Sequence, residues 1–162
     1  MVITRLKKRA DFLRVAKTKI VAKTSTMLIQ CSLASNLENQ KGDLKVGFTA
    51  SRRVGNAVKR NRAKRRLRSL VDQYLRKKVF EIVGSDSQKT ALEFVFIAVP
   101  ATVTADFNRL IQDFVKGVRW CLSQLDHQTL DGRPIILHKQ ITKDEGYIFK
   151  PQEDNVNVTF SC

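Results

Sequence analysis

The segment from Arg52 to Arg68, RRVGNAVKRNRAKRRLR, carries nine Lys and Arg side chains in seventeen positions. No Asp or Glu occurs anywhere from Leu44 to Val71. Unpaired charges at this density are not buried in a folded domain, so the segment must lie at the surface, in water or against an anionic partner. Any fold for this chain has to close an apolar core while leaving this stretch outside.

The composition is that of a folded, strongly basic protein. With 162 residues, 43% of them hydrophobic, the chain is long and apolar enough for one domain plus a modest extension. Thirty Lys and Arg against fifteen Asp and Glu leave a net charge of +15. Such a charge gives much of the surface a positive potential, which favours a polyanion as partner. Nucleic acid and an anionic membrane surface both meet that description.

Two further features of the sequence indicate the cellular location of the protein. The N-terminal residues MVITRLKKRADF lack an apolar stretch, and the longest apolar run, Phe94 to Val99, is far shorter than the roughly 20 residues of a membrane span. Cys31, Cys121 and Cys162 form no C-x-x-C pair, so we expect neither disulfides nor a zinc site. The sequence predicts a soluble, cytoplasmic protein with reduced thiols.

The positive charge is confined to the first part of the chain. Residues 1–125 hold 26 basic and 9 acidic side chains, net +17, whereas residues 126–162 hold 4 basic and 6 acidic ones, net −2. The second part is rich in turn sequences such as DGRP and KPQEDN, with one apolar cluster, PIIL, at Pro134 to Leu137. We predict one domain over residues 1–125 and a weakly ordered extension over residues 126–162.

Hydrophobic periodicity predicts an α+β sandwich, a small sheet with helices packed on it. Helical spacing predicts helices over residues 6–17, from the basic segment to about residue 80, and over residues 107–125. Alternation predicts strands over residues 25–33 and 44–51, which we expect to form a hairpin around the loop NLENQKGD. The apolar run EFVFIAV, residues 93–99, predicts a central buried strand. The apolar positions of these patterns are Phe12, Val15, Ala16, Met27, Ile29, Cys31, Leu33, Val46, Phe48, Ala50, Leu67, Leu70, Val71, Tyr74, Leu75, Phe107, Leu110, Ile111, Phe114, Val118, Cys121, Leu122 and Leu125.

On the second helix, basic and apolar side chains are predicted to take opposite sides. Successive residues turn by about 100° around a helix. The basic row is Arg62, Arg65 and Arg76, opposite Leu67, Leu70 and Tyr74, with Arg66 and Arg68 on the flanks. A row of guanidinium groups can bridge successive phosphates, so phosphodiester backbone is the expected ligand.

The residues just before this helix predict a second anion contact. In SRRVGN, Gly55 permits a tight turn and Asn56 is a good N-cap. The N–H groups at the helix start, beside Arg52 and Arg53, form a local anion site. A merely solvated helix face or a targeting signal is the plainer alternative for the charge run. A helix-turn-helix DNA-binding motif fits this segment less well, because a strand is predicted after the basic helix instead of a second helix.

These segments resemble, in type, order and spacing, the bacterial ribonuclease P protein subunit. They are RLKKRADFLRV, KVGFTASRRVGNAVKRNRAKRRLRSLV, FVFIAVP and the closing amphipathic helix, and together they span residues 4–125. The family's R-N-R signature stands here as Arg60-Asn61-Arg62. The resemblance implies the family's α+β fold, like domain 2 of ribosomal protein S5. It also implies a protein subunit for a ribozyme that removes 5′ leaders from precursor tRNA.

The resemblance further implies how residues divide between RNA partners. The catalytic RNA of ribonuclease P is expected along the basic helix and the preceding loop, against Arg52, Arg53, Gly55, Asn56, Lys59, Arg60, Asn61, Arg62, Lys64, Arg65, Arg66 and Arg68. The 5′ leader of precursor tRNA is expected in a central cleft between the first helix and the sheet. Phe12 matches the family's first aromatic there, Phe48 is a second candidate, and Ala16, Met27 and Gln30 stand where aromatics are common. Core packing is the alternative role for Phe12. Neither a membrane nor DNA is expected as partner.

The residues speak against a nuclease centre on the protein itself. Such a centre needs clustered carboxylates that hold metal, or histidines for proton transfer. Both histidines, His127 and His138, lie in the extension, and the nine carboxylates of residues 1–125 are scattered. We predict no catalytic and no metal-binding residue on the protein. The resemblance implies that Mg²⁺, held mainly by the RNA subunit, supplies the chemistry.

Two other functions fit the same charge and size. A non-enzymatic ribosomal RNA-binding protein would have no reason to prefer precursor over mature tRNA. A small nuclease acting alone would cleave RNA without a ribozyme. The leader cleft separates the first alternative from a ribonuclease P protein, and the missing histidine and carboxylate cluster speaks against the second.

Overall fold

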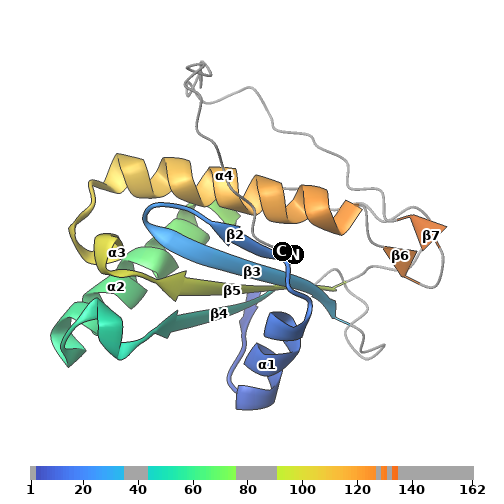
Figure 1. Ribbon diagram of the computed structural model, residues 1–162, viewed down its shortest axis with the longest axis horizontal. Helices are drawn as coiled ribbons and strands as arrows, with labels where there is room; N and C mark the ends of the chain where they lie inside the picture. Colours follow the sequence, from blue (N-terminus) through green and yellow to red (C-terminus); the bar gives the residue numbers. More distant parts are fainter. Residues whose placement is uncertain (1–2, 35–43, 76–90, 127–128, 131–132, 135–162) are drawn as a thin grey trace.

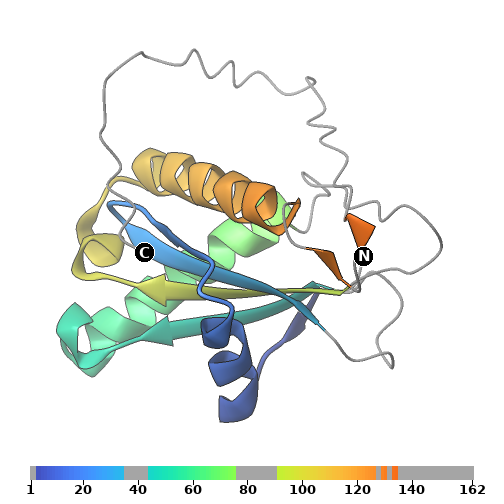
Figure 2. The ribbon, with the colours of Figure 1, turned by 45° about the vertical axis from the view of Figure 1, so that its right-hand side comes forward.

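The computed structural model describes residues 3–34, 44–75, 91–126, 129–130 and 133–134. β1 (Ile3–Arg5), β2 (Val21–Lys23), β3 (Met27–Ala34), β4 (Leu44–Ala50) and β5 (Ala91–Ala98) form one sheet in the order β1-β4-β5-β3-β2. The helices are α1 (Arg9–Lys17), the short η2 (Arg52–Val54), α2 (Ala57–Leu70), η3 (Val71–Leu75), α3 (Pro100–Thr104) and α4 (Phe107–Asp126). α2 and α4 cover one face of the sheet and α1 lies on the other (Figures 1 and 2). The predicted α+β sandwich is confirmed.

β5 is the central strand. It pairs antiparallel with the whole of β3 and parallel with the whole of β4. β1 runs parallel beside β4, and β2 runs antiparallel beside β3. The predicted hairpin between β3 and β4 is wrong, because β5 lies between them; the loop NLENQKGD itself falls outside the described residues. A strand with apolar side chains on both faces is stabilised by a neighbour on each side, and β5 is such a strand.

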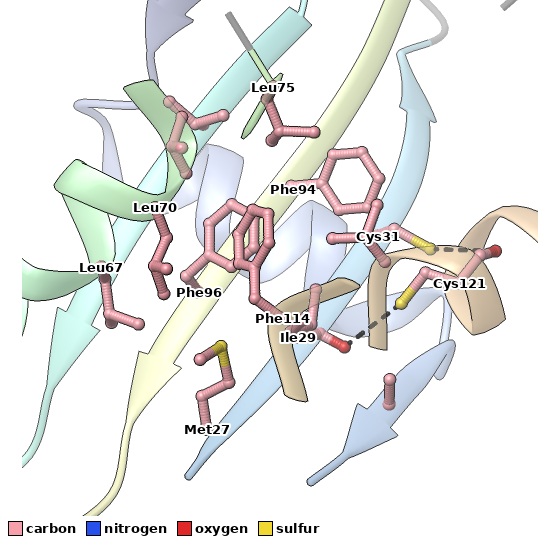
Figure 3. Close-up of a cluster of buried hydrophobic side chains, with 14 of the residues drawn as sticks. Met27, Ile29, Cys31, Leu67, Leu70, Leu75, Phe94, Phe96, Phe114 and Cys121 are labelled. Carbon is pink, nitrogen blue, oxygen red and sulfur yellow. Dashed lines mark hydrogen bonds between the residues drawn. The ribbon is translucent and has the colours of Figure 1, made fainter. Parts of the chain in front are cut away.

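The core lies between the sheet and the α2–α4 layer. Phe94 and Phe96 of β5 stack at 5.9 Å between ring centroids, and Phe114 of α4 stacks on Phe96 at 5.2 Å (Figure 3). Leu67 and Leu70 of α2 close the same cluster, and neither is exposed to solvent. The apolar stripe predicted for residues 107–125 is confirmed, and the helix continues from α2 through the π turn η3 at least to Leu75. Residues 76–90, with the predicted Arg76, are outside the described part of the chain.

Two of the cysteines are free thiols in this core. Cys31 donates to the carbonyl of Cys121 at 3.7 Å, and Cys121 donates to the carbonyl of Ile29 at 3.5 Å (Figure 3). The hydrogen bond with Cys121 and burial raise the pKa of the Cys31 thiol well above its ordinary value. The Cys31 thiol therefore stays protonated at neutral pH, which makes it a poor nucleophile. Cys162 lies outside the described residues.

A buried carboxylate ties the turn between β2 and β3 to α4. Asp113 accepts hydrogen bonds from the Ser25 hydroxyl at 2.7 Å, the Thr26 hydroxyl at 2.9 Å and the Thr26 N–H at 3.0 Å. Arg109 forms an ion pair with it at 3.5 Å. Asp113 is 5% exposed, and this ring of donors satisfies its oxygens inside the protein. The edge strand β2 is thereby anchored to the α4 layer.

The short elements were not predicted from the sequence. β1, β2, η2 and α3 have three to five residues each, which is too few for a hydrophobic period to show. In the predicted extension, β6 (Thr129–Leu130) and β7 (Arg133–Pro134) pair antiparallel. The division at residue 125 stays a prediction. Among the described helices, none combines the length and the apolar character that crossing a membrane would require.

Replacement of Phe114 tests the core. We expect Phe114→Ala to lower the free energy of unfolding by about 3–5 kcal/mol, because it removes the ring that stacks on Phe96 and leaves a cavity. Urea unfolding followed by circular dichroism measures the change. The control Val58→Ala removes a side chain that is 74% exposed and should change the same free energy by less than about 0.5 kcal/mol. Equal losses would contradict this account of the core.

Candidate nucleic-acid interface

The start of α2 is built as the sequence predicted. Gly55 has a φ of +125°, a conformation that favours glycine, and a Cβ there would come within 2.8 Å of the Lys59 side chain. Asn56 is the N-cap, and its side-chain oxygen accepts a hydrogen bond from the Lys59 N–H at 3.0 Å. Just before the turn, η2 buries Val54 and leaves Arg52 and Arg53 exposed. Two guanidinium groups therefore stand beside a capped helix start.

One side of α2 is an exposed polar and basic row. Asn61, Arg62 and Arg65 are exposed, whereas the side chains on the inner side are fully buried, as predicted. The inner residues are Ala63, Leu67 and Leu70. Because these anchors hold the helix by its other side, the exposed row faces outward along the length of α2.

A second basic row runs along the flank of α2. Arg60, Lys64 and Arg68 follow at four-residue spacing and are half-buried. Arg60 donates from Nη1 to the Gly55 carbonyl at 2.7 Å. The Arg68 guanidinium lies 5.8 Å from the centre of the Phe48 ring, a cation–π contact. This flank is packed against the protein as well as being basic.

Arg66 is placed differently from the prediction. Its guanidinium donates to the carbonyls of Thr102 at 3.0 Å and Val103 at 2.7 Å, and also to that of Ala105. These are carbonyls at the end of α3, which no later turn of that helix satisfies. Burial, with the nearby charge of Arg62, lowers the pKa of Arg66. Arg66 thus joins α2 to α3, and its donors point into the protein instead of along the exposed row.

On the opposite face of the sheet, α1 carries Phe12. The Phe12 ring lies directly on Gly47 of β4, where an added Cβ would sit 2.6 Å from Phe12 Cε1. Val15 is buried beside Leu6 and Val95, and Phe12 packs half-buried against that cluster. The predicted apolar position Ala16 is exposed instead. Gly47 is what lets an aromatic ring approach the strand so closely.

Phe48 and Met27 do not share a face with Phe12. Neighbouring residues of a strand point to opposite faces. Phe48 therefore packs in the α2 layer, with its ring 5.9 Å from that of Phe96. Met27 is fully buried in the same layer. The prediction that Phe12 and Phe48 line one cleft is wrong, and so is the placement of Met27 in that cleft.

The face that α1 leaves open presents other side chains. Strand register places Lys23, Leu28, Ile97 and Thr49 side by side across β2, β3, β5 and β4, and we call this set the open row. Leu28, Ile97 and Thr49 are half-buried and Lys23 is exposed. Gln30 lies in the adjoining register row, on the same face. The open row thus offers apolar surface next to a cation.

Two residues of this face were missed by sequence reasoning, although each left a signal. Gly47 is a glycine inside a predicted strand, which often marks a close approach of another group to the backbone. Glu93 is a lone carboxylate at the head of the run EFVFIAV, and it is fully buried. In the part of the chain that the structure describes, no three His, Cys, Asp or Glu side chains are grouped so as to hold a metal ion.

The comparison with known proteins decides the family. The sequence model of the family described as Ribonuclease P matches residues 3–121 of this chain. The chain belongs to the ribonuclease P protein family. It is 39% identical over 117 residues to the ribonuclease P protein component of Paramagnetospirillum magneticum, covering 72% of this chain and 81% of that protein. It is 35% identical over 118 residues to that of Ruegeria pomeroyi, covering 72% and 85%.

The fold agrees with a solved ribonuclease P protein. The structure of the Staphylococcus aureus protein matches with a TM-score of 0.53 and 22% identity, over 71% of this chain and 92% of that chain. As a ribonuclease P protein, the chain is the protein subunit of a ribonucleoprotein nuclease of tRNA processing, and it has RNA as its partner. The alternative of a ribosomal RNA-binding protein is not favoured.

Paired substitutions on α2 test the division between outward and inward arginines. Arg66→Gln should lower the free energy of unfolding by about 1–3 kcal/mol, because it leaves α3 carbonyls without their donors. Arg62→Gln removes an equal charge from an exposed position and should change it by less than about 0.5 kcal/mol. Urea unfolding of both variants measures the difference. Similar values for the two would refute the inward role of Arg66.

Proposed function

We propose that the basic side of α2 binds the catalytic RNA of ribonuclease P through its phosphates. The exposed row of Asn61, Arg62 and Arg65 supplies bidentate donors, and Arg52 and Arg53 extend it at the helix start. The flank of Arg60, Lys64 and Arg68 adds charge beside that row. Lys59 and the capped turn at Gly55 and Asn56 complete the surface, whereas Arg66 acts indirectly by holding α3.

We further propose that the α1 face holds the single-stranded 5′ leader of precursor tRNA. Phe12 is half-buried, so part of its ring is free to stack on a base, and the open row offers apolar contact with Lys23 at one end for a phosphate. The observation that carries this proposal is that α1 and α2 lie on opposite faces of the sheet (Figure 2). Two RNAs can therefore contact the protein at once without competing for the same side chains.

In this proposal the protein binds RNA and leaves the chemistry to the RNA subunit. Four of the described carboxylates are engaged within the protein: Asp113 accepts from the β2–β3 turn, Asp11 and Glu93 pair with Arg14, and Asp106 accepts from the Asn108 N–H. They do not fit a metal centre. Mg²⁺ is assigned to the RNA, whose phosphates hold it, and neutralisation of other phosphates by the protein should reduce the Mg²⁺ that the folded RNA needs. The site of action is proposed to be the cytoplasm, where precursor tRNA is made.

The salt dependence of RNA binding tests the α2 surface. Binding to a bacterial ribonuclease P RNA should give a log–log salt slope of about −5 to −8, as expected if six to nine phosphates are neutralised. Arg62→Gln with Arg65→Gln should weaken binding and make the slope less steep by about 2. The charge-matched control, Lys116→Gln with Arg119→Gln on the exposed side of α4, should change the slope by less. Equal changes in both double variants would contradict a specific α2 surface.

Cleavage of precursor tRNA at low Mg²⁺ tests the function itself. The assay compares the RNA subunit alone, the protein alone, and both together. We expect the protein to be inert by itself and to lower the Mg²⁺ concentration that the RNA needs for cleavage. Cleavage by the protein alone would assign the chemistry to the protein. No effect on the ribozyme, combined with tight binding to other structured RNA, would favour a ribosomal RNA-binding protein.

A further inference from the structure

A buried carboxylate pairs with a half-buried guanidinium where α1 meets the sheet. Glu93 lies within the central strand and has no exposed surface. Its carboxylate accepts from Arg14 Nη2 at 2.7 Å, from Arg14 Nε at 3.1 Å and from the Ser32 hydroxyl at 3.2 Å. Arg14 also meets Asp11 at 3.1 Å within α1. The hydrogen bonds and charge of Glu93 raise the pKa of Arg14, which stays charged at every physiological pH.

Stability alone does not account for this pair. Taking the Glu93 carboxylate out of water costs about as much free energy as its attraction to the half-buried Arg14 returns, so an apolar pair of similar volume would hold α1 as firmly. An apolar pair would not, however, fix the orientation of α1 on the sheet. A guanidinium bound through two nitrogens to one carboxylate fixes both a distance and an orientation. An ion pair of this kind is therefore suited to setting the position of the helix that carries Arg14.

α1 is also held at its C-terminal end, where the hydroxyl of the C-cap residue Thr18 donates to the Cys31 carbonyl of β3 at 2.7 Å. It is nine residues long, too short to persist as a helix without docking, and its buried side chain is Val15. At about 100° per residue, Phe12 lies about 60° to one side of Val15 and Arg14 about 100° to the other. Leu13 is 52% exposed and gives little packing. α1 therefore contacts the sheet through Val15 in the middle. On one side of Val15, Phe12 packs on Gly47, and on the other side Arg14 pairs with Glu93.

If the Arg14 flank is released, α1 can roll about Val15 and carry the Phe12 ring with it. The Ser32–Glu93–Lys45 register row lies two residues along the strands from the row of Gly47 and Val95. That is about 7 Å from the surface on which the ring rests. Asp11 strengthens the coupling, because it pairs with the same Arg14 Nη2 one residue before Phe12. The carboxylate and the aromatic are thereby linked through one rigid turn of helix.

We propose that the Arg14–Glu93 pair is a positioning device: it sets the rotation of α1, so that Phe12 faces the open row and the protein binds precursor tRNA through its leader. This inference rests on the proposed leader surface. Arg14 and Glu93 then govern the preference for precursor over mature tRNA without contacting the tRNA themselves.

The test uses Glu93→Gln, Arg14→Gln and the double variant of the full-length protein. The double variant leaves no buried charge without a partner, so it keeps the test valid if a single variant folds poorly. Asp113→Asn is the matched control, because it alters a buried, hydrogen-bonded carboxylate that anchors the other side of the sheet. Circular dichroism and thermal melting establish that each protein is folded. Affinity for the RNA subunit establishes that the α2 surface is intact.

Each protein is assembled with a bacterial ribonuclease P RNA, and dissociation constants are measured for a precursor tRNA with a leader and for the same tRNA without it. The discrimination ratio is the dissociation constant for the tRNA without a leader divided by that for the tRNA with a leader. It should fall about five- to tenfold for the Arg14 and Glu93 variants, with affinity for the RNA subunit unchanged. Asp113→Asn should change the ratio by less than about twofold, whatever it does to melting temperature. A purely structural role would give the Glu93 and Asp113 variants the same ratio.

The outcomes separate the two proposals. If the wild-type protein shows no preference for the leader-bearing tRNA, the leader surface is wrong and the positioning role falls with it. If the wild type discriminates, Phe12→Ala removes the preference, and Glu93→Gln, Arg14→Gln and the double variant all keep it, the leader surface stands and the positioning role is overturned. Reduced discrimination in the Arg14 and Glu93 variants, with the control unchanged, supports both.

Discussion

The burial of β5 on both of its faces is the constraint on which the rest of the structure depends. On one face Phe94 and Phe96 stack with Phe114 and draw α4 and α2 into a single layer. On the other, Glu93 and Val95 hold α1. A strand of this kind would expose apolar surface at a sheet edge, so it takes the centre and β3 and β4 pair on either side of it. The connection from β4 to β5 then has to cross over the sheet, and α2 forms part of that crossover.

This arrangement keeps the two proposed RNA surfaces of so basic a protein apart. α2 is anchored by Ala63, Leu67 and Leu70, so its cations face outward from one layer. α1 occupies the other face, where Asp11 and Glu93 offset part of the basic charge and half-buried apolar side chains are available. A phosphate backbone is bound by cations, whereas an unpaired base is bound by aromatic and apolar side chains. These two kinds of side chain lie on opposite faces of the sheet. The same separation lets one surface be altered by substitution without disturbing the other.

Not every residue of a motif does what the motif suggests. Arg66 stands in the middle of the basic helix, yet its donors satisfy carbonyls at the end of α3, because those partly buried carbonyls have no later turn of their own helix to supply a donor. The resemblance implies that Phe48 and Met27 belong to the leader cleft, yet the pleat turns both toward the core on the opposite face. Conversely, Gly47 and Glu93 have a part in the α1 face although neither resembles an RNA-binding residue.

The sequence by itself determined the properties that arise within a few residues of one another. These are the period of each main helix and strand, the cap at Asn56, the turn at Gly55, the outward side of α2 and, through the R-N-R motif, the family. Only the tertiary structure decided which strands are neighbours, which face each strand residue takes, and which charges are used inside the protein. Those choices depend on contacts between segments far apart in the chain, such as Arg14 with Glu93 or Arg66 with α3, and local periodicity carries no information about them.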